Sequence, residues 1–222
     1  MLTRFHDRRE AGRHLATALR PLVAGEPLQV LALPRGGVPV GYEVALALGA
    51  PLDVFLVRKL GLPGQEELAM GAIAEGGVQV LNRDVIEPLR IPHRVIEQVA
   101  ASEQAELARR QRLYRGDAAP ADLRGRTVLV VDDGLATGST MAAAVAGIRA
   151  QDPARIVVAV PVASREAMAA LREVADECVS ALTPAAFGGV GQWYEDFRQT
   201  SDDEVRALLE AARHHALASR AS

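Results

Sequence analysis

The chain has 222 residues, of which 49% are hydrophobic and only 4% aromatic, so it is long enough for one α/β domain with a core of Val, Leu and Ala. Its net charge of −3 provides no broad basic surface and argues against a nucleic-acid-binding protein. The single cysteine excludes an intramolecular disulfide and a multi-cysteine metal site. No apolar run is long enough to cross a membrane and no basic leader precedes an apolar stretch, so we expect a cytoplasmic protein without membrane contact.

Strand-like and helical segments alternate along the chain. This alternation predicts an α/β fold, a mostly parallel sheet flanked by helices, in a single domain over residues 1–222. In chain order we expect a helix over 8–21, a strand over 28–33, a helix over 38–48, a strand over 53–58, a hairpin over 72–81 that turns at 75–77, a strand over 127–131, a helix over 139–150, a strand over 155–162, a helix over 165–174, a strand over 176–182 and a helix over 202–217.

One long helix, over about 92–116, lies outside this alternation. Pro92 at its start and Gly116 at its end are typical helix boundary signals. We interpret this helix as an insertion in the α/β domain.

The most informative stretch covers residues 127–140. Its first five residues form a β-branched apolar run, typical of a buried parallel strand, whose end presents Asp132 and Asp133 at the sheet edge where such folds bind ligands. Two adjacent carboxylates can accept hydrogen bonds from a vicinal diol. The next small residues, Ala136-Thr137-Gly138-Ser139-Thr140, supply backbone N–H groups, hydroxyls and a helix N-terminus, which together favour a phosphate. The spacing indicates a site for a ribose 5-phosphate.

Two other interpretations of this stretch fit the residues less well. A Walker loop does not fit, because only three residues separate Gly134 from Gly138 and Ser139 follows in place of lysine. An ordinary acidic cap on a strand-to-helix turn is the structural alternative, but such a turn needs neither two acids nor the Thr-Gly-Ser-Thr run.

The stretch resembles the 5-phosphoribosyl pyrophosphate (PRPP) signature of the type I phosphoribosyltransferases. The resemblance implies a three-layer α/β fold with a small hood and a C-terminal helix over about 183–218. It implies that Asp132 and Asp133 hold the ribose and favour its developing charge. Mg²⁺ is the expected cofactor, held through PRPP and water, since no set of protein ligands for a metal is evident. The residues expected to anchor the 5-phosphate are Ala136, Thr137, Gly138, Ser139 and Thr140.

A second glycine loop, Leu33-Pro34-Arg35-Gly36-Gly37, lies between the first predicted strand and a helix. Arginine donors, two glycines and a helix N-terminus are suited to an anion. In the resembled family the matching loop holds pyrophosphate, so Arg35, Gly36 and Gly37 are candidate pyrophosphate ligands. The resemblance also implies a cis peptide between Pro34 and Arg35. The structural alternative is a tight strand-to-helix turn.

Arg58 and Lys59 begin a third candidate segment, which continues through a glycine and proline loop to Glu67. It resembles the mobile loop of adenine phosphoribosyltransferases, which folds over the site and excludes water. The resemblance implies that both cations stabilise the departing pyrophosphate and that Lys59 is catalytic. The alternative is a solvated charge pair at a strand end, followed by a surface loop.

Together these loops imply a Mg²⁺-dependent phosphoribosyltransferase with Lys59, Asp132 and Asp133 as catalytic residues, acting on PRPP and a nitrogenous base or similar aromatic acceptor. Relatives that act on 6-oxopurines have an aspartate at the position of Ala136, so this chain is closer to the adenine enzymes. The insertion helix, in contrast, indicates an uncharacterised branch of the family. A PRPP-binding sensor without transferase activity and, more remotely, a ribose-phosphate hydrolase stay open, as does a homodimeric state.

Residues 187–197 hold four of the eight aromatic residues of the chain, in a glycine-rich segment after the last strand. An aromatic side chain there could stack on an acceptor base, and Trp193 is the candidate. Equally, these aromatic side chains could pin the C-terminal helix to the sheet.

Overall fold

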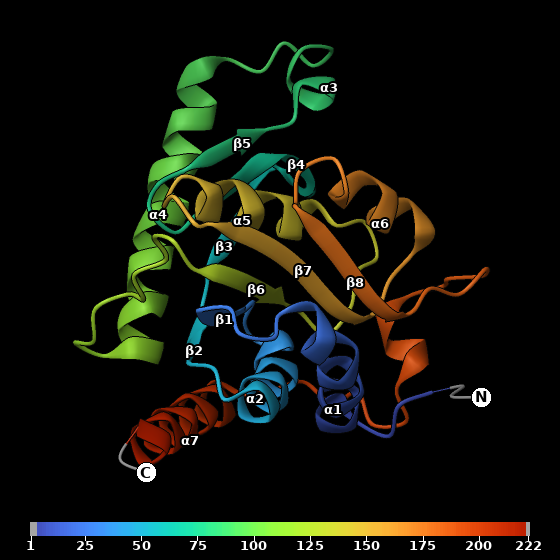
Figure 1. Ribbon diagram of the computed structural model, residues 1–222. Coiled ribbons are helices and arrows are strands. Elements are labelled where there is room, and N and C mark those ends of the chain that lie inside the picture. The colour runs from blue at the N-terminus through green and yellow to red at the C-terminus, as the bar shows by residue number, and fades with distance from the viewer. Residues whose placement is uncertain (1–3, 221–222) are drawn as a thin grey trace.

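The computed structural model describes residues 4–220. Its main sheet has five parallel strands in the order β2-β1-β6-β7-β8, which confirms the predicted parallel sheet (Figure 1). The central strand β6 is buried at every position, as its uninterrupted apolar run requires. The strands are β1 Leu28–Ala32, β2 Leu52–Val54, β6 Thr127–Val131, β7 Arg155–Val162 and β8 Glu177–Leu182.

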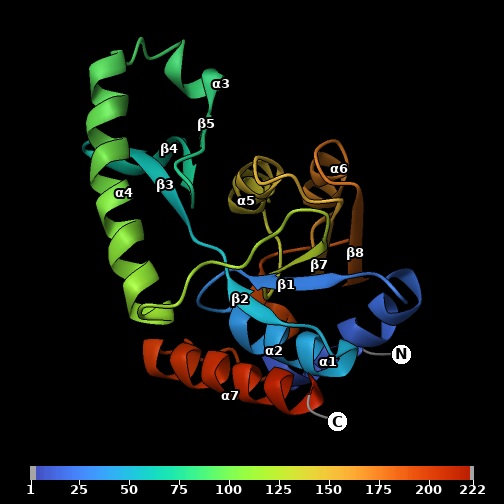
Figure 2. The same ribbon diagram turned by 60° about the vertical axis from the view of Figure 1, so that its left-hand side comes forward.

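Helices cover both faces of the main sheet and make it the middle of three layers (Figure 2). Helices α1 and α2 pack on one face together with α7, while α5 and α6 pack on the other. The apolar faces of these helices bury two separate side-chain clusters, one against each face of the sheet. The bounds are α1 Arg8–Leu19, continued by the 3-10 helix η1 Arg20–Leu22, then α2 Gly37–Leu48, α5 Ser139–Arg149, α6 Arg165–Leu171, the 3-10 helix η2 Val190–Trp193, and α7 Asp202–Arg220.

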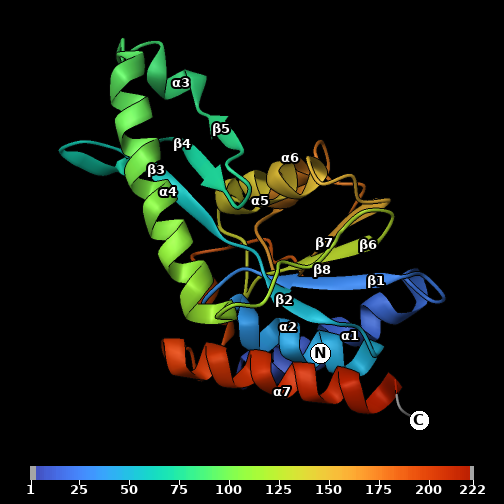
Figure 3. The same ribbon diagram turned by 90° about the vertical axis from the view of Figure 1, so that its left-hand side faces the viewer.

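Residues 57–115 form a unit that projects from the main sheet, which we call the arm (Figure 3). The predicted insertion helix is confirmed as α4, and the predicted hairpin turn at 75–77 joins β4 to β5. The arm is larger than the expected insertion, because it includes a second, antiparallel sheet in the order β3-β4-β5. Its elements are β3 Val57–Leu62, β4 Gln65–Ala74, β5 Gln79–Leu81, α3 Arg83–Ile86 and α4 His93–Arg115.

Two expectations for the segment 53–67 were wrong. The single strand expected over 53–58 is two strands of different sheets, interrupted at Phe55 and Leu56. Both of these residues are buried where the sheets meet, so the apolar pattern continues across the break and conceals it. The expected loop after Lys59 is a hairpin instead, in which Pro63-Gly64 forms the tight turn between β3 and β4. Proline followed by glycine suits a two-residue turn, and the sequence analysis overlooked this signal.

A buried ionic cluster ties the arm to the main sheet. Arg115, at the end of α4, has a side chain only 5% exposed and lies 2.9 Å from an oxygen of Asp53 on β2. It also donates hydrogen bonds to Glu75, in the β4–β5 turn, and to the backbone carbonyl of Val54. One guanidinium therefore connects the last turn of α4 with an edge strand of one sheet and a turn of the other.

Candidate active site

The two glycine-containing loops meet at the carboxyl edge of the main sheet. Strands β1 and β6 are parallel neighbours, and the Leu33 N–H donates to the Val131 carbonyl at 2.8 Å. A Cβ atom on Gly36 would lie 2.0 Å from an oxygen of Asp133, and one on Gly37 would lie 2.7 Å from the Val131 carbonyl oxygen. Only glycine fits at these positions. The Pro34–Arg35 peptide is cis, as the resemblance implied.

Each signature carboxylate has one engaged oxygen and one that is available. Asp132 Oδ1 accepts the backbone N–H of Asp133 at 2.8 Å. Asp133 Oδ2 accepts Arg8 Nε at 2.8 Å. Within residues 4–220 the second oxygen of each carboxylate accepts no hydrogen bond, so two acceptors lie at the sheet edge, as two neighbouring hydroxyls require.

These carboxylates are placed where ionisation is costly. Burial raises the pKa of Asp132 well above its ordinary value, and the adjacent Asp133 charge raises it further. Burial also raises the pKa of Asp133, while the charge and hydrogen bond of Arg8 oppose that rise. A ligand that donates hydrogen bonds from hydroxyl groups, or that carries positive charge, would therefore stabilise the ionised form of this pair.

The signature loop leads into α5 with its N–H groups uncovered. Gly138 adopts a left-handed conformation, with φ of 78°, and no side chain caps the helix that begins at Ser139. Thr137 and Ser139 are exposed, and their hydroxyl oxygens lie 3.4 Å apart. A helix start with unpaired N–H groups and nearby hydroxyls has the features that favour an anion, and the contact of this loop with a 5-phosphate stays a prediction.

The structure separates the two cations predicted to clamp pyrophosphate. Arg58 Nε lies 2.6 Å from an oxygen of Glu103 on α4. Lys59 is exposed and lies on the opposite face of β3, because successive strand residues alternate. Arg35 has its Nη1 3.9 Å from Asp202 Oδ1, and that same oxygen accepts the Tyr114 hydroxyl at 2.6 Å.

A small cavity of about 30 Å³ lies where α4 meets the same edge of the main sheet. Its walls come from both predicted phosphate loops, from the start of the arm and from Arg110 of α4, whose partner is Glu106 at 2.9 Å. The sequence analysis did not single out Arg110, which lines this cavity. The cavity is lined by Leu33, Pro34, Phe55, Leu56, Val57, Arg58, Leu107, Arg110 and Thr140.

The aromatic segment after β8 packs against Phe5, near the start of the chain. Trp193 packs with Phe5, Val162 and Tyr194, and its carbonyl accepts the Phe5 N–H at 2.9 Å. Its indole N–H is buried without a partner among residues 4–220. The Tyr194 hydroxyl donates to the backbone carbonyl of Asp133 at 2.6 Å. Thus Tyr194, which the sequence analysis did not single out, contacts the signature directly, while contact of Trp193 with an acceptor stays a prediction.

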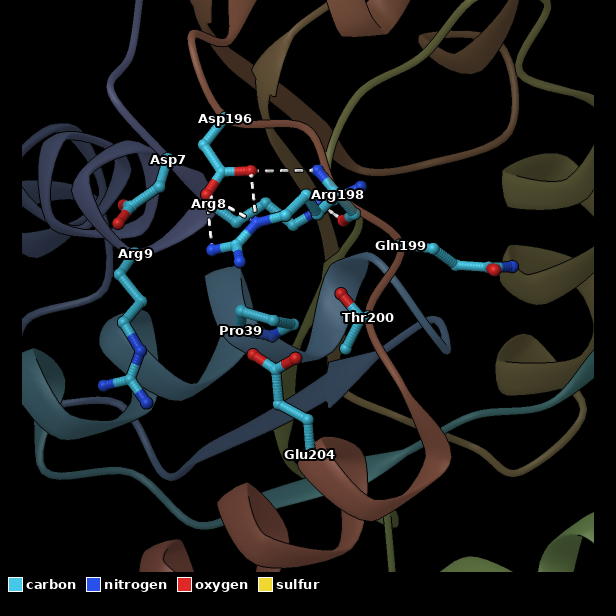
Figure 4. A pocket seen from close by; sticks show the side chains of 9 residues that line it. All are labelled: Asp7, Arg8, Arg9, Pro39, Asp196, Arg198, Gln199, Thr200 and Glu204. Carbon is cyan, nitrogen blue, oxygen red and sulfur yellow. Dashed lines mark hydrogen bonds and ion pairs between the residues drawn. The ribbon is translucent and has the colours of Figure 1, made fainter.

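Two larger cavities lie elsewhere on the main domain, the first of them beside the signature loop. One, of about 810 Å³, lies between Ala136 and Thr137 of the signature loop, Ser164 after β7 and Phe187 after β8. The other, of about 360 Å³, lies between the start of α1 and the segment before α7 (Figure 4). Its arginine side chains each contact an acid, and the three pairs are Arg8 with Asp133, Arg9 with Glu43 and Arg198 with Asp196.

Residues 4–220 contain no group of three or more His, Cys, Asp or Glu side chains that could hold a metal ion, and no helix among them is long and apolar enough to span a membrane. Mg²⁺ bound through PRPP, with water as its other ligand, therefore stays a prediction.

The sequence matches the family described as "Phosphoribosyl transferase domain" over residues 1–196. The chain belongs to this family. It is 48% identical over 208 residues to a Mycobacterium tuberculosis protein of strains CDC 1551 and H37Rv, named in both "Putative phosphoribosyl transferase". That alignment covers 94% of this chain but 47% of the relative, so the chain spans about half the length of the curated relatives it matches.

A solved structure shares the fold of this phosphoribosyltransferase chain. The crystal structure of TT1426 from Thermus thermophilus is 46% identical, with a TM-score of 0.79, and the match covers 93% of this chain and 97% of that one. The coverage includes most of the arm, so the arm belongs to the shared fold and is not a peculiarity of this sequence.

Proposed function

We propose that this phosphoribosyltransferase transfers the 5-phosphoribosyl group from PRPP to a nitrogenous aromatic acceptor and releases pyrophosphate. The observation that carries the proposal is the pair of available oxygens on Asp132 and Asp133, between the Gly36 loop and the uncapped start of α5. These three features match the diol, the pyrophosphate and the 5-phosphate of one ligand.

In the proposed reaction an acceptor nitrogen bonds to C1 of the ribose, the bond from C1 to the pyrophosphate oxygen breaks, and the acceptor loses a proton. Positive charge develops on the sugar ring and negative charge on the leaving group, as in other oxocarbenium reactions. Carboxylates at Asp132 and Asp133 stabilise the sugar charge, and the loop of Arg35, Gly36 and Gly37 stabilises the leaving group. The remaining contribution is orientation of the reactants.

Mg²⁺ would neutralise charge on the pyrophosphate oxygens and keep several of its own waters. The residues present fit this arrangement. The signature offers carboxylates that can contact metal-bound water, and residues 4–220 contain no closed cage of protein ligands. Arg58 and Arg110 are the cations beside the small cavity at the loop edge and would contact the leaving group there.

We assign the acceptor to the 810 Å³ cavity. It adjoins Ala136 and Thr137, so an acceptor bound there would lie next to the anchored 5-phosphoribosyl group. Phe187 supplies an aromatic wall, whereas Trp193 does not line this cavity. Phe187 is thus a stronger candidate than Trp193 for stacking on a base.

The deciding experiment is release of pyrophosphate from PRPP with Mg²⁺ across a panel of purine, pyrimidine and pyridine bases, beside a calorimetric PRPP titration. Release that depends on one class of base supports the transferase. Tight PRPP binding without release favours a sensor, and release without any base favours a hydrolase. Absence of PRPP binding would refute all three.

The substitution Asp132→Asn tests the diol assignment. The amide oxygen can still accept the Asp133 N–H, while an NH₂ group replaces the available acceptor. We expect PRPP affinity to fall about 10- to 100-fold, as loss of a hydrogen bond to a charged group predicts. The free energy of unfolding should not decrease, because the substitution removes a buried carboxylate that is costly to ionise.

The matched control is Asp122→Asn, which removes an exposed carboxylate that forms an ion pair with Arg124. It should leave PRPP affinity unchanged. Equal affinities of wild type and Asp132→Asn would remove Asp132 from the ribose site.

A further inference from the structure

Arg8, the first residue of α1, reaches the signature from a distant part of the sequence. Its Nε donates to Asp133 Oδ2 at 2.8 Å and its Nη1 donates to the backbone carbonyl of Arg198 at 2.7 Å. The guanidinium carbon also lies 4.0 Å from the centre of the Phe197 ring. The side chains of Arg8 and Asp133 are only 11% and 15% exposed, so the contact is shielded from solvent.

Few charges surround Asp133. Asp132 lies beside it on the same loop, Arg8 approaches from α1, and Tyr194 approaches from the segment after η2. Burial raises the pKa of the Tyr194 hydroxyl, so this group stays neutral and donates its proton to the Asp133 backbone carbonyl. Within residues 4–220, Arg8 is therefore the one cation that pairs with Asp133.

The contact also fixes the direction of the carboxylate. Arg8 occupies Oδ2, the oxygen that lies against Gly36, and leaves Oδ1 for a ligand. A second bond, to the Arg198 carbonyl, and the Phe197 ring prevent the guanidinium from turning away. An arginine fork held on several sides is better suited to this task than a flexible lysine.

We propose that Arg8 is a positioning residue that keeps Asp133 ionised and turned so that its free oxygen receives a ribose hydroxyl. This inference rests on the proposed function, because it takes the hydroxyl to belong to PRPP. Arg8 contacts the other oxygen of Asp133, Oδ2, and would act on the ribose through this carboxylate.

The proposal has a defined pH signature. A carboxylate accepts a hydroxyl fully only when it is ionised, so PRPP affinity is lost as the pH falls through the pKa of Asp133. Arg8 opposes the rise in this pKa that burial causes. Removal of Arg8 therefore raises the pKa of Asp133, and PRPP affinity is lost at a higher pH.

The test compares Arg8→Gln with Arg9→Gln. Arg9 is the next residue of α1 and lines the same 360 Å³ cavity, but Figure 4 shows its side chain turned away from that of Arg8. It approaches Glu43 at 3.4 Å and is 47% exposed. The control therefore removes the same charge from the same helix turn without touching Asp133. Arg8→Lys, which retains the charge, is the conservative variant.

Two readouts are measured on each variant. Carbon-13 NMR of the Asp133 carboxyl gives its pKa in the free protein, and calorimetry gives PRPP affinity from about pH 4, close to the ordinary pKa of an aspartate, to about pH 9. We expect Arg8→Gln to raise the pKa of Asp133 and to weaken PRPP binding at neutral pH about tenfold. Arg9→Gln should change neither, and Arg8→Lys, which keeps the positive charge, should leave the pKa of Asp133 closer to the wild-type value than Arg8→Gln does.

A double-mutant comparison completes the test. In an Asp133→Asn background Arg8→Gln should cause no further loss of PRPP affinity, since the carboxylate on which it acts is gone. An unchanged pKa in Arg8→Gln, or the same loss of affinity in the Asp133→Asn background, would overturn the proposal. If wild type fails to bind PRPP while Arg8→Gln still raises the pKa, the proposed function fails and the counter-ion role of Arg8 stands.

Discussion

The carboxyl edge of the main sheet at Asp132 and Asp133, which we call the signature edge, and the arm hold their charged side chains in different ways. At the signature edge Asp132 is fixed by a backbone N–H and Asp133 by Arg8, and the groups proposed to bind phosphate include the uncapped N–H groups at the start of α5. In the arm, Arg58 and Arg110 are held by acids of α4, and Lys59 is exposed. Under the proposed function, ribose recognition would depend on the main sheet alone, whereas part of the leaving-group contacts would depend on how the arm is attached.

Ribose 5-phosphate and Mg²⁺-pyrophosphate are natural probes of this difference. The first carries the groups expected at the signature edge, and the second carries the group expected between the loop at Gly36 and the arm. A change in the arm should weaken binding of the second probe and spare the first.

The largest effect is expected from Arg115→Met, which breaks the attachment of the arm. It leaves Asp53 and Glu75 facing each other without their shared guanidinium. Removal of one partner from a buried ion pair costs about 3–5 kcal/mol, and we expect a loss of that size in the free energy of unfolding measured with urea. Variant protein that remains folded should bind ribose 5-phosphate normally and Mg²⁺-pyrophosphate weakly.

Arg124→Met provides the control for Arg115→Met. Arg124 also contacts an aspartate, Asp122 at 3.0 Å, but both side chains are exposed, and exposed pairs contribute little to stability. A loss of stability as large in this variant as in Arg115→Met would mean that burial of the Arg115 cluster is not what attaches the arm.

A smaller and more local effect is expected from Arg110→Ala. This change removes a cation from the cavity shared by the two loops and the arm, so affinity for Mg²⁺-pyrophosphate should fall about tenfold. Arg109→Ala is a close control, because Arg109 contacts the same Glu106 at 2.7 Å but is 60% exposed and does not line the cavity. Equal affinities of these two variants for pyrophosphate would exclude Arg110 from the site.

The same contrast explains what could be predicted from the sequence. Val128 to Val131 and the two acids after them lie on one short segment, so strand, edge position and chemistry follow from local pattern. Arg8 is 125 positions from Asp133, and no local pattern indicates that contact. Just before the arm, Phe55 and Leu56 form the break between the two sheets and are both buried, so their apolar character suggested one continuous strand.

Substitution of Lys59 is expected to have the smallest effect on ligand affinity and a clear effect on kcat. Lys59 is the only lysine in the sequence, and it is exposed on β3, outside the cavity that contains Arg58. If Lys59 approaches pyrophosphate only as the bond to C1 breaks, Lys59→Ala should lower kcat about tenfold with little change in PRPP affinity.

Because the chain has a single lysine, Lys59 can also be followed without substitution. An amine-selective acetylating reagent can modify only Lys59 and the terminal amine, and peptide mass spectrometry distinguishes the two. Saturating Mg²⁺-pyrophosphate should slow acetylation of Lys59 and leave the terminal amine unaffected if the side chain contacts the leaving group in the bound state. Unchanged acetylation together with unchanged kcat in Lys59→Ala would identify Lys59 as a solvated strand residue, and the leaving-group clamp would then consist of arginines from the loop at Gly36 and from the arm.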